Sequence, residues 1–372
     1  MDEPIYTLGP VTSLLIWRAA MQGLVHMPAK PSLRPDFEGS RSAIRKMRTI
    51  PVLQALGDVP VDAIVAAARR AHACGSLDII VLRGSLPEGS LWEIGKGVYV
   101  CSPELCFALL ARGGFDRHLL EIGCELCGTY SLSYNQTGRY CACEQLTSCK
   151  KLGDYLAQMG GRHGIKAARR ALGYLQDGSA SPFETALYLM LTLDPACGGY
   201  GIKNPRLHGT IDIPEQARSV LGVGCLTAGL TYANERGEVY VVEKCDDFAT
   251  WPRMDVGHSK GVGAHDTQTA DIPWHEIAFD YELDIVVFRG RDLQCFDVFD
   301  RKAMRLGRLV GCEPAASEGI LLHQRLELFH NLFDASKLAA EHVYLRKMAG
   351  YGRAGRRVQR QGQSQVPLMA SA

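Results

Sequence analysis

The spacing of hydrophobic and polar residues changes twice in the C-terminal half of the chain. Apolar residues recur at helical spacing until residue 193, and the last helix of this run, SPFETALYLMLTL (181–193), begins with a capping serine, a proline and Glu184. Extended runs follow the glycine-rich loop at 197–201, and helical spacing returns from residue 292. This order predicts an α/β fold with a mixed sheet flanked by helices. The expected strands are 207–213, 225–233, 238–244 and 283–290, and the expected later helices are 292–311 and about 317–348.

The N-terminal half shows shorter patterns, typical of an α+β arrangement. The segment 59–78 has the spacing of an amphipathic helix, and IIVLRG (79–84) is typical of a strand. LWEIGKGVYVCS (91–102) predicts a hairpin, and Ser102 at its end is placed to cap the helix that follows. The polar, irregular segment 129–146 predicts a linker or an inserted loop.

Length and charge limit the organisation and the partners. A chain of 372 residues is long for one hydrophobic core, so we expect an N-terminal part over 1–145 and a C-terminal part over 146–348. The arginine-, glutamine- and serine-rich end, 349–372, is predicted to be a disordered basic tail. The net charge is only +1, so binding of nucleic acid requires a local basic surface.

The sequence also predicts a compartment. No apolar run reaches the roughly 18 residues that a membrane span needs, and the acidic N-terminus does not have the pattern of a signal peptide. We therefore expect a cytoplasmic protein without a membrane partner. The cysteine count is 13, an odd number, which favours free thiols over a disulfide framework.

Four segments occur in an order that resembles a group of uncharacterised proteins from gut actinobacteria. The arrangement is also similar to chains that join an antitoxin-like segment of the abortive-infection AbiEi type to a domain like the very-short-patch-repair endonucleases. The resemblance covers about residues 75–311. It implies an antitoxin-like N-terminal part and a C-terminal core of the restriction-endonuclease superfold. The segments are GVYVCSPELCFALLA (97–111), EIGCELCGTYSL (121–132), QLTSCKKLGDYL (145–156) and ALGYLQDGSASPFETALYLMLTLDPACGGYG (171–201).

The resemblance further implies the place of a metal-dependent nuclease site. Glu184 matches the glutamate of the first helix, and Glu243 matches a glutamate at the end of a strand, so both would bind Mg²⁺. Asp247 could assist them, and Lys244 would position the attacking water. Phosphodiester hydrolysis needs such hard oxygen ligands and a cation beside the nucleophile. The alternative is that Glu184 serves only as the carboxylate of a helix start.

The central aspartate of that site is missing from this chain. Counting back from Glu243 places Tyr232 near the expected position, on a strand without an acidic residue. Strand alternation also puts Lys244 on the face opposite to Glu243 unless a bulge intervenes. We therefore predict a degenerate site. Whether the chain is an enzyme stays open: surviving activity would be that of a Mg²⁺-dependent endonuclease whose missing aspartate comes from elsewhere, such as Asp212 or Asp266.

A basic stretch precedes the helix that carries the candidate glutamate. Residues 147–174 contain six lysines and arginines and one acidic residue, Asp154. Lys166, Arg169 and Arg170 lie three to four residues apart, so they share a helix face that could contact the phosphates of DNA or RNA. An ordinary solvated face is the alternative.

Cysteine spacing offers a second kind of site. Cys124, Cys127, Cys141 and Cys143 form two close pairs, C-x2-C and C-x-C, which could hold Zn²⁺ through four thiolates. A C-x-C pair does not form the usual knuckle turn, and the first pair falls at an expected helix end. Zinc is therefore the less favoured interpretation, and ordinary free thiols are the alternative.

These observations lead to two functional predictions of different classes. The first is a protein that interacts with nucleic acid, in defence or regulation, through a degenerate nuclease fold. The second is a protein-interaction or regulatory module that neither binds nucleic acid nor catalyses a reaction. An exposed apolar patch would favour the second prediction.

Overall fold

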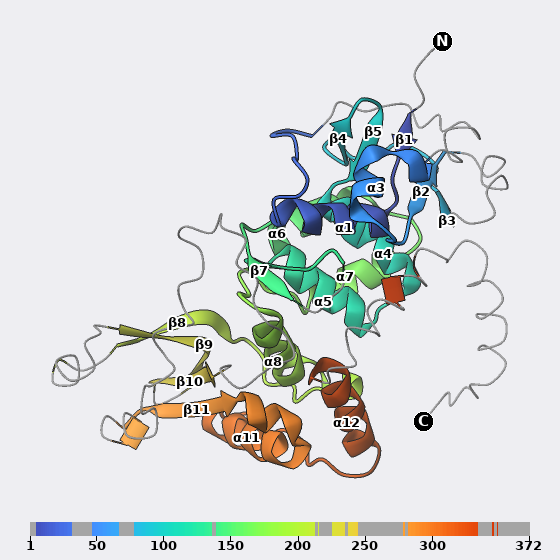
Figure 1. Ribbon diagram of the computed structural model, residues 1–372. Helices are drawn as coiled ribbons and strands as arrows, with labels where there is room; N and C mark the ends of the chain where they lie inside the picture. Colours follow the sequence, from blue (N-terminus) through green and yellow to red (C-terminus); the bar gives the residue numbers. More distant parts are fainter. Residues whose placement is uncertain are drawn as a thin grey trace, which may run out of the picture.

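The protein combines helices with several sheets (Figure 1). The computed structural model describes residues 5–31, 47–66, 78–135, 139–212, 215, 225–234, 237–244, 278–279, 282–333, 344–345 and 348. For this part of the chain the predicted mixed α/β class is confirmed, and no helix in it has the length and hydropathy needed to cross a membrane. The predicted tail (349–372) and the segment 245–277 lie outside the described residues.

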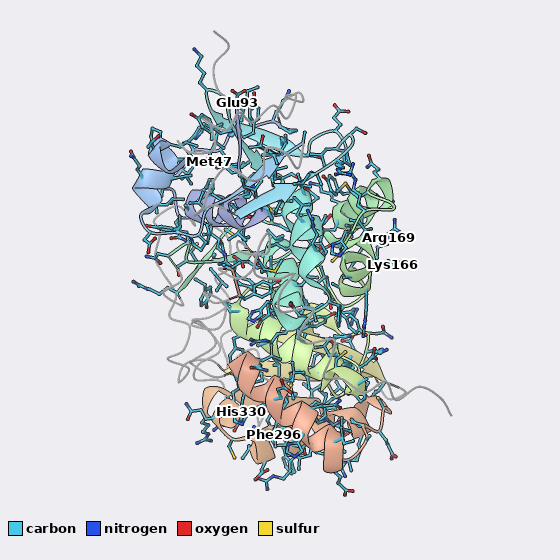
Figure 2. All side chains as sticks on the ribbon, turned by 90° about the vertical axis from the view of Figure 1, so that its right-hand side faces the viewer. Met47, Glu93, Lys166, Arg169, Phe296 and His330 are labelled. Atoms are coloured by element: carbon cyan, nitrogen blue, oxygen red, sulfur yellow. The ribbon has the colours of Figure 1, made fainter. Side chains whose placement is uncertain are left out.

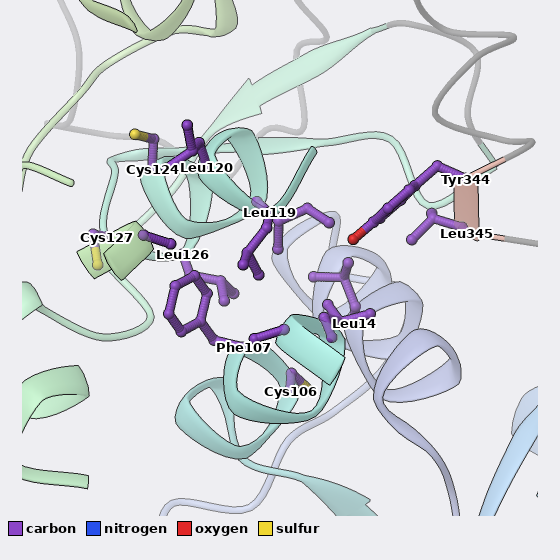
Figure 3. Close-up of a cluster of buried hydrophobic side chains, with 14 of the residues drawn as sticks. Leu14, Cys106, Phe107, Leu119, Leu120, Cys124, Leu126, Cys127, Tyr344 and Leu345 are labelled. Carbon is purple, nitrogen blue, oxygen red and sulfur yellow. The ribbon is translucent and has the colours of Figure 1, made fainter. Parts of the chain in front are cut away.

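Helices form the core of the N-terminal half. They are α1 (Pro10–Met21), α3 (Pro51–Leu56), α4 (Pro103–Leu110), α5 (Arg117–Leu126), α6 (Cys149–Gln158) and α7 (Ile165–Leu172), with the 3₁₀ helices η1 (Met47–Thr49) and η3 (Ala111–Gly113). α1 packs against α4, α4 against α5 and α6, and α5 against α7. Their apolar side chains meet in one buried cluster (Figure 3). This cluster spans the predicted division at residue 145, because α6 and α7 belong to it.

Three small sheets accompany these helices. Their strands are β1 (Tyr6–Thr7), β2 (Asp62–Val65), β3 (Asp78–Val81), β4 (Leu91–Gly95), β5 (Val98–Cys101), β6 (Tyr130–Leu132) and β7 (Tyr140–Ala142). β4 and β5 form the hairpin predicted at 91–102, and β1 pairs in parallel with β5. Ser102 then caps α4 as predicted: its hydroxyl accepts a hydrogen bond from the Leu105 N–H at 3.2 Å.

Two expectations for this half are wrong. The helix expected over 59–78 is replaced at its start by strand β2, which pairs in parallel with β3; residues 67–77 lie outside the described residues. Ala63, Ile64 and Val65 are all buried, so the run has no polar face for a surface helix to present. The polar segment 129–146, expected to be irregular, contains the β6–β7 hairpin.

A buried ion pair connects α1 to α5. Arg18 donates to both oxygens of Glu125, with Nε at 3.0 Å from Oε1 and Nη2 at 2.6 Å from Oε2. Glu125 also accepts a hydrogen bond from the Leu132 N–H at 2.9 Å. Arg18 and Glu125 are 1% and 3% exposed, so the pair is shielded from water and cross-links the first helix to the centre of the core.

The C-terminal half is built around a four-stranded sheet. Its elements are α8 (Pro182–Thr192), η4 (Pro195–Cys197), β8 (Arg206–Asp212), β9 (Cys225–Asn234), β10 (Gly237–Lys244), β11 (Asp284–Arg289), η5 (Gly290–Gln294), α11 (Phe296–Val310) and α12 (Gly319–Phe333). The spatial order is β11-β10-β9-β8. β8, β9 and β10 form an antiparallel meander, and β11 is parallel to β10. The four strands predicted from the pattern are confirmed to within one or two residues.

An aromatic cluster fixes α11 and α12 against this sheet. The ring of Phe299 on α11 lies 5.1 Å from that of Phe288 on β11, and 5.4 and 5.6 Å from those of Phe329 and Phe333 on α12. Such tilted ring pairs bury large apolar areas and contribute beyond area alone. α8 contacts both α12 and α5, so it joins the two halves of the molecule.

The chain returns to the N-terminal helices near its end. Tyr344 stacks on His118 of α5 with ring centres 4.4 Å apart, and Leu345 is fully buried in the same cluster (Figure 3). Gly113 lies so close to Met348 that a Cβ at position 113 would approach its sulfur to 2.7 Å. Residues far apart in sequence therefore complete one core.

Candidate functional site

Glu184 lies in the first turn of α8 and is buried. The hydroxyl of Ser181 accepts a hydrogen bond from the Glu184 N–H at 3.0 Å, which caps the helix. The Glu184 carboxylate in turn accepts from the Ala180 N–H at 2.6 Å. This pair of reciprocal hydrogen bonds resembles a capping box. The positive end of the helix dipole also stabilises a negatively charged carboxylate at this position.

The same carboxylate binds a histidine that the sequence did not single out. His208 of β8 places Nε2 at 3.0 Å from Oε1 and 3.1 Å from Oε2 of Glu184. The hydrogen bond to Glu184 raises the pKa of His208, against the opposing effect of burial. His208 has a φ of 54°, an uncommon value for a residue with a side chain. A carboxylate that orients an imidazole can support proton transfer, because the pair fixes which nitrogen carries the proton.

Two of the other predicted catalytic residues, Glu243 and Lys244, end β10. In the register of β10 and β11, Glu243 pairs with Phe288 and Lys244 pairs with Arg289. The side chains of Glu243 and Lys244, and all of Asp247, lie outside the described residues, so the predicted catalytic set stays a prediction.

Tyr232 lies on β9, near the position where the resemblance leads us to expect an aspartate. It pairs with Val239 across β9 and β10 and is 1% exposed. Burial raises the pKa of its phenol, so the group stays neutral and cannot replace a carboxylate as a Mg²⁺ ligand. β9 carries no acidic residue, as the sequence indicates.

The three predicted phosphate contacts are all exposed on α7. Arg169 donates to the carbonyl of Leu156 at 3.0 Å, and Arg170 lies over the ring of Phe115 with its guanidinium carbon 4.1 Å from the ring centre. Both side chains are thereby partly fixed. Among the described residues, none of the three, Lys166 included, forms an ion pair with a carboxylate.

The four cysteines predicted as zinc ligands are free thiols that do not form one cluster. Cys141 of β7 directs its sulfur to backbone carbonyls, 3.8 Å from the Ser131 oxygen. In the described part of the chain, one group of side chains is close enough to share a metal ion, and it joins Cys127 to Cys149 and Asp177. Sequence spacing missed this group because its members come from three separate segments.

Comparison with known proteins adds no assignment to this geometry. No family model matches the chain, and neither the curated proteins nor the solved structures contain a significant match.

Proposed function

We propose that this protein binds nucleic acid through a restriction-endonuclease-like sheet whose hydrolytic site is degenerate. The observation that carries the proposal is the order of elements around the sheet. A helix with an early glutamate, α8, leads into an antiparallel three-stranded meander, and the fourth strand, β11, joins the third in parallel before α11. The helix with an early glutamate and the meander after it are the part of this order that the resemblance implies for a nuclease core.

The contacts of Glu184 support the degenerate character of the site. Its carboxylate accepts from Ala180 and His208, so a bound Mg²⁺ would have to displace at least one of these partners. Mg²⁺ prefers several oxygen ligands in a strict geometry, and β9 supplies no carboxylate. Glu184 is thus better suited to hold His208 and the start of α8 than to anchor a catalytic metal.

Basic side chains lead from α7 toward this sheet. Figure 2 shows Lys166 and Arg169 along the outer side of α7, away from Phe296 and His330 of the lower helices. Arg170 donates toward the sulfur of Cys197 in η4 at 3.9 Å, and Lys203, just before β8, binds Asp194 at 2.8 Å. Asp194 neutralises Lys203, so the positive charge without a carboxylate partner lies on α7, beside η4 and the approach to β8, and a phosphate backbone can contact it there.

The test compares two variants that remove equal charge. One changes Lys166, Arg169 and Arg170 to alanine; the other changes Arg301, Arg305 and Arg308, which are exposed on α11. Binding of labelled single- and double-stranded DNA and RNA is measured over a range of salt. We expect the α7 variant to bind at least about tenfold more weakly than the wild type. The slope of log binding constant against log salt concentration should become less steep by about 0.9 for each lost phosphate contact with double-stranded DNA. The α11 variant should bind like the wild type.

Cleavage is measured in the same samples with Mg²⁺ or Mn²⁺. Binding without cleavage supports the proposal. Cleavage that disappears in both Glu184→Gln and Glu243→Ala would establish an active nuclease and overturn the degenerate assignment. Equal loss of binding in the α7 and α11 variants would remove α7 as the specific interface.

The protein-interaction module remains the alternative prediction. Among the described residues, the strongly exposed large hydrophobic side chains are Leu24, Phe279 and Ile320, which come from three distant parts of the sequence. No specific observation in the described part of the chain favours this alternative. Absence of binding to every nucleic acid at low salt, where phosphate contacts are strongest, would favour it.

A further inference from the structure

Three segments bring ligating side chains together beside α5. Cys127 follows the last residue of α5, Cys149 is the first residue of α6, and Asp177 lies in the turn that precedes α8. The two sulfurs and a carboxylate oxygen all lie within 4.8 Å of one another. Cys127 is buried, Cys149 is partly exposed and Asp177 is exposed, so the group reaches from the core to the surface. An ion could therefore enter from solvent and bind against the core.

Backbone hydrogen bonds hold these three segments in place. The Thr147 N–H donates to the Leu126 carbonyl at 3.0 Å, which ties the approach to α6 to the end of α5. The Gly178 N–H donates to the Cys127 carbonyl at 2.8 Å, which ties the Asp177 turn to the same point. The ligating atoms thus converge on a preformed frame, which reduces the ordering cost of binding.

Asp177 is oriented by its own hydrogen bonds. Its Oδ1 accepts from the Cys149 N–H at 2.7 Å and from the Gln145 amide at 3.1 Å. Partners of this kind orient a ligating carboxylate in established metal sites. No described residue is hydrogen-bonded to the second oxygen, Oδ2, which leaves that atom for a metal.

A third thiol lies next to the group. Cys124 is one helical turn before Cys127 on α5, and the two are labelled at the same end of that helix in Figure 3. Burial raises the pKa of the Cys124 thiol and the charge of Cys149 raises it further, while a hydrogen bond from the Gln176 backbone lowers it. Cys124 is thus close to both Cys149 and the segment that carries Asp177.

We propose that Cys127, Cys149 and Asp177 form a binding site for a thiophilic divalent cation of the zinc class, with Cys124 or water as the fourth ligand. Two thiolates and a carboxylate are ligands that Zn²⁺ accepts, and hard cations such as Mg²⁺ avoid thiolates. A tetrahedral Zn²⁺ with sulfur at about 2.3 Å needs ligand atoms about 3.8 Å apart. The two sulfurs and the carboxylate oxygen therefore have to move only slightly closer to one another. Each thiol releases its proton to solvent when it binds the ion.

The test uses the full chain, reduced and stripped of metal with a chelator. Co²⁺ and then Zn²⁺ are added, and binding is followed through the visible and near-ultraviolet bands that thiolate-bound tetrahedral Co²⁺ produces. We expect one ion per chain, and displacement of Co²⁺ by Zn²⁺. Cys149→Ser and Asp177→Asn should each weaken Zn²⁺ binding by at least about tenfold. Asp177→Asn keeps an oxygen for the Cys149 N–H, so the fold is preserved in at least one of the two variants.

Cys143→Ser is the matched control, because it changes another partly exposed cysteine that belongs to the ligand set expected from spacing alone. It should bind Zn²⁺ like the wild type. Loss of binding in Cys143→Ser, with Cys149→Ser unaffected, would move the site to the spaced cysteines and overturn the proposal. Failure of the reduced wild type to take up Co²⁺ or Zn²⁺ would also overturn it.

Discussion

The two halves of the molecule each bury a glutamate, and they differ in the cation that holds it. Glu125 in the N-terminal half is bound by both ends of an arginine fork, and both partners are almost fully buried. Glu184 in the C-terminal half is bound by His208, whose side chain is 30% exposed. A guanidinium stays charged at every relevant pH, whereas an imidazole titrates near neutrality. The same acidic residue is thus part of a permanent cross-link in one half and of a titratable contact in the other.

The largest effect should come from breaking the permanent cross-link. Arg18→Ala leaves Glu125 as a buried charge without its main partner, so the free energy of unfolding should fall by about 3–5 kcal/mol. Urea denaturation followed by circular dichroism measures this change. The double variant Arg18→Met with Glu125→Leu removes both charges and should recover much of the loss. If Arg18→Ala were as stable as the wild type, the Arg18–Glu125 pair would not be a stabilising cross-link.

An intermediate effect is expected at the helix starts of the two halves. Ser102 caps α4 and Ser181 caps α8 through the same hydroxyl contact, at 3.2 and 3.0 Å. Replacement of either serine by alanine should lower the free energy of unfolding by about 1 kcal/mol. Ser181→Ala should also disturb the Glu184–His208 contact, which is visible in the histidine signals of an NMR spectrum. Ser102→Ala should leave those signals unchanged and serves as the control.

The smallest effect concerns pH. Because the folded state raises the pKa of His208 above the ordinary value of 6.5, its contact with Glu184 contributes fully below pH 6.5. That contribution is lost as the pH rises through the raised pKa. The stability difference between wild type and His208→Gln should therefore shrink as the pH rises through this window. The difference between wild type and Arg18→Ala should stay constant there. If the stability difference from wild type stayed constant with pH for both His208→Gln and Arg18→Ala, the two contacts would not differ in their dependence on pH.

Local signals in the sequence were sufficient for much of the fold. The Ser181-Pro182 start of α8 and the apolar run of β11 follow from patterns within a few residues, and both are confirmed. Strand β2 could not be found in this way. Its Asp62 is buried because the carboxylate accepts hydrogen bonds from Val11 and Thr12 at the start of α1, some fifty positions earlier in the chain. The spacing of the segment 59–78 alone predicts an amphipathic helix instead.

In the candidate sites, too, sequence patterns identify residues only where the signal is local. Glu184 could be singled out because its helix start has a sequence signature, but His208 could not, since a single histidine in a strand carries no local signal. Cys127 was singled out by its C-x2-C spacing. Its neighbours Cys149 and Asp177 become visible only when the ends of α5 and α6 and the turn before α8 are placed in space.

The return of Tyr344, Leu345 and Met348 to α5 and η3 has a consequence for how the protein is made. During synthesis η3 and α5 leave the ribosome more than two hundred residues before Tyr344, Leu345 and Met348, the side chains that pack against them. Until then, the contacts of His118 with Tyr344 and of Gly113 with Met348 cannot form, so this part of the core is completed late. Domains that fold as they emerge do not have this delay. The packing around η3 and α5 therefore depends on residues that are synthesised much later.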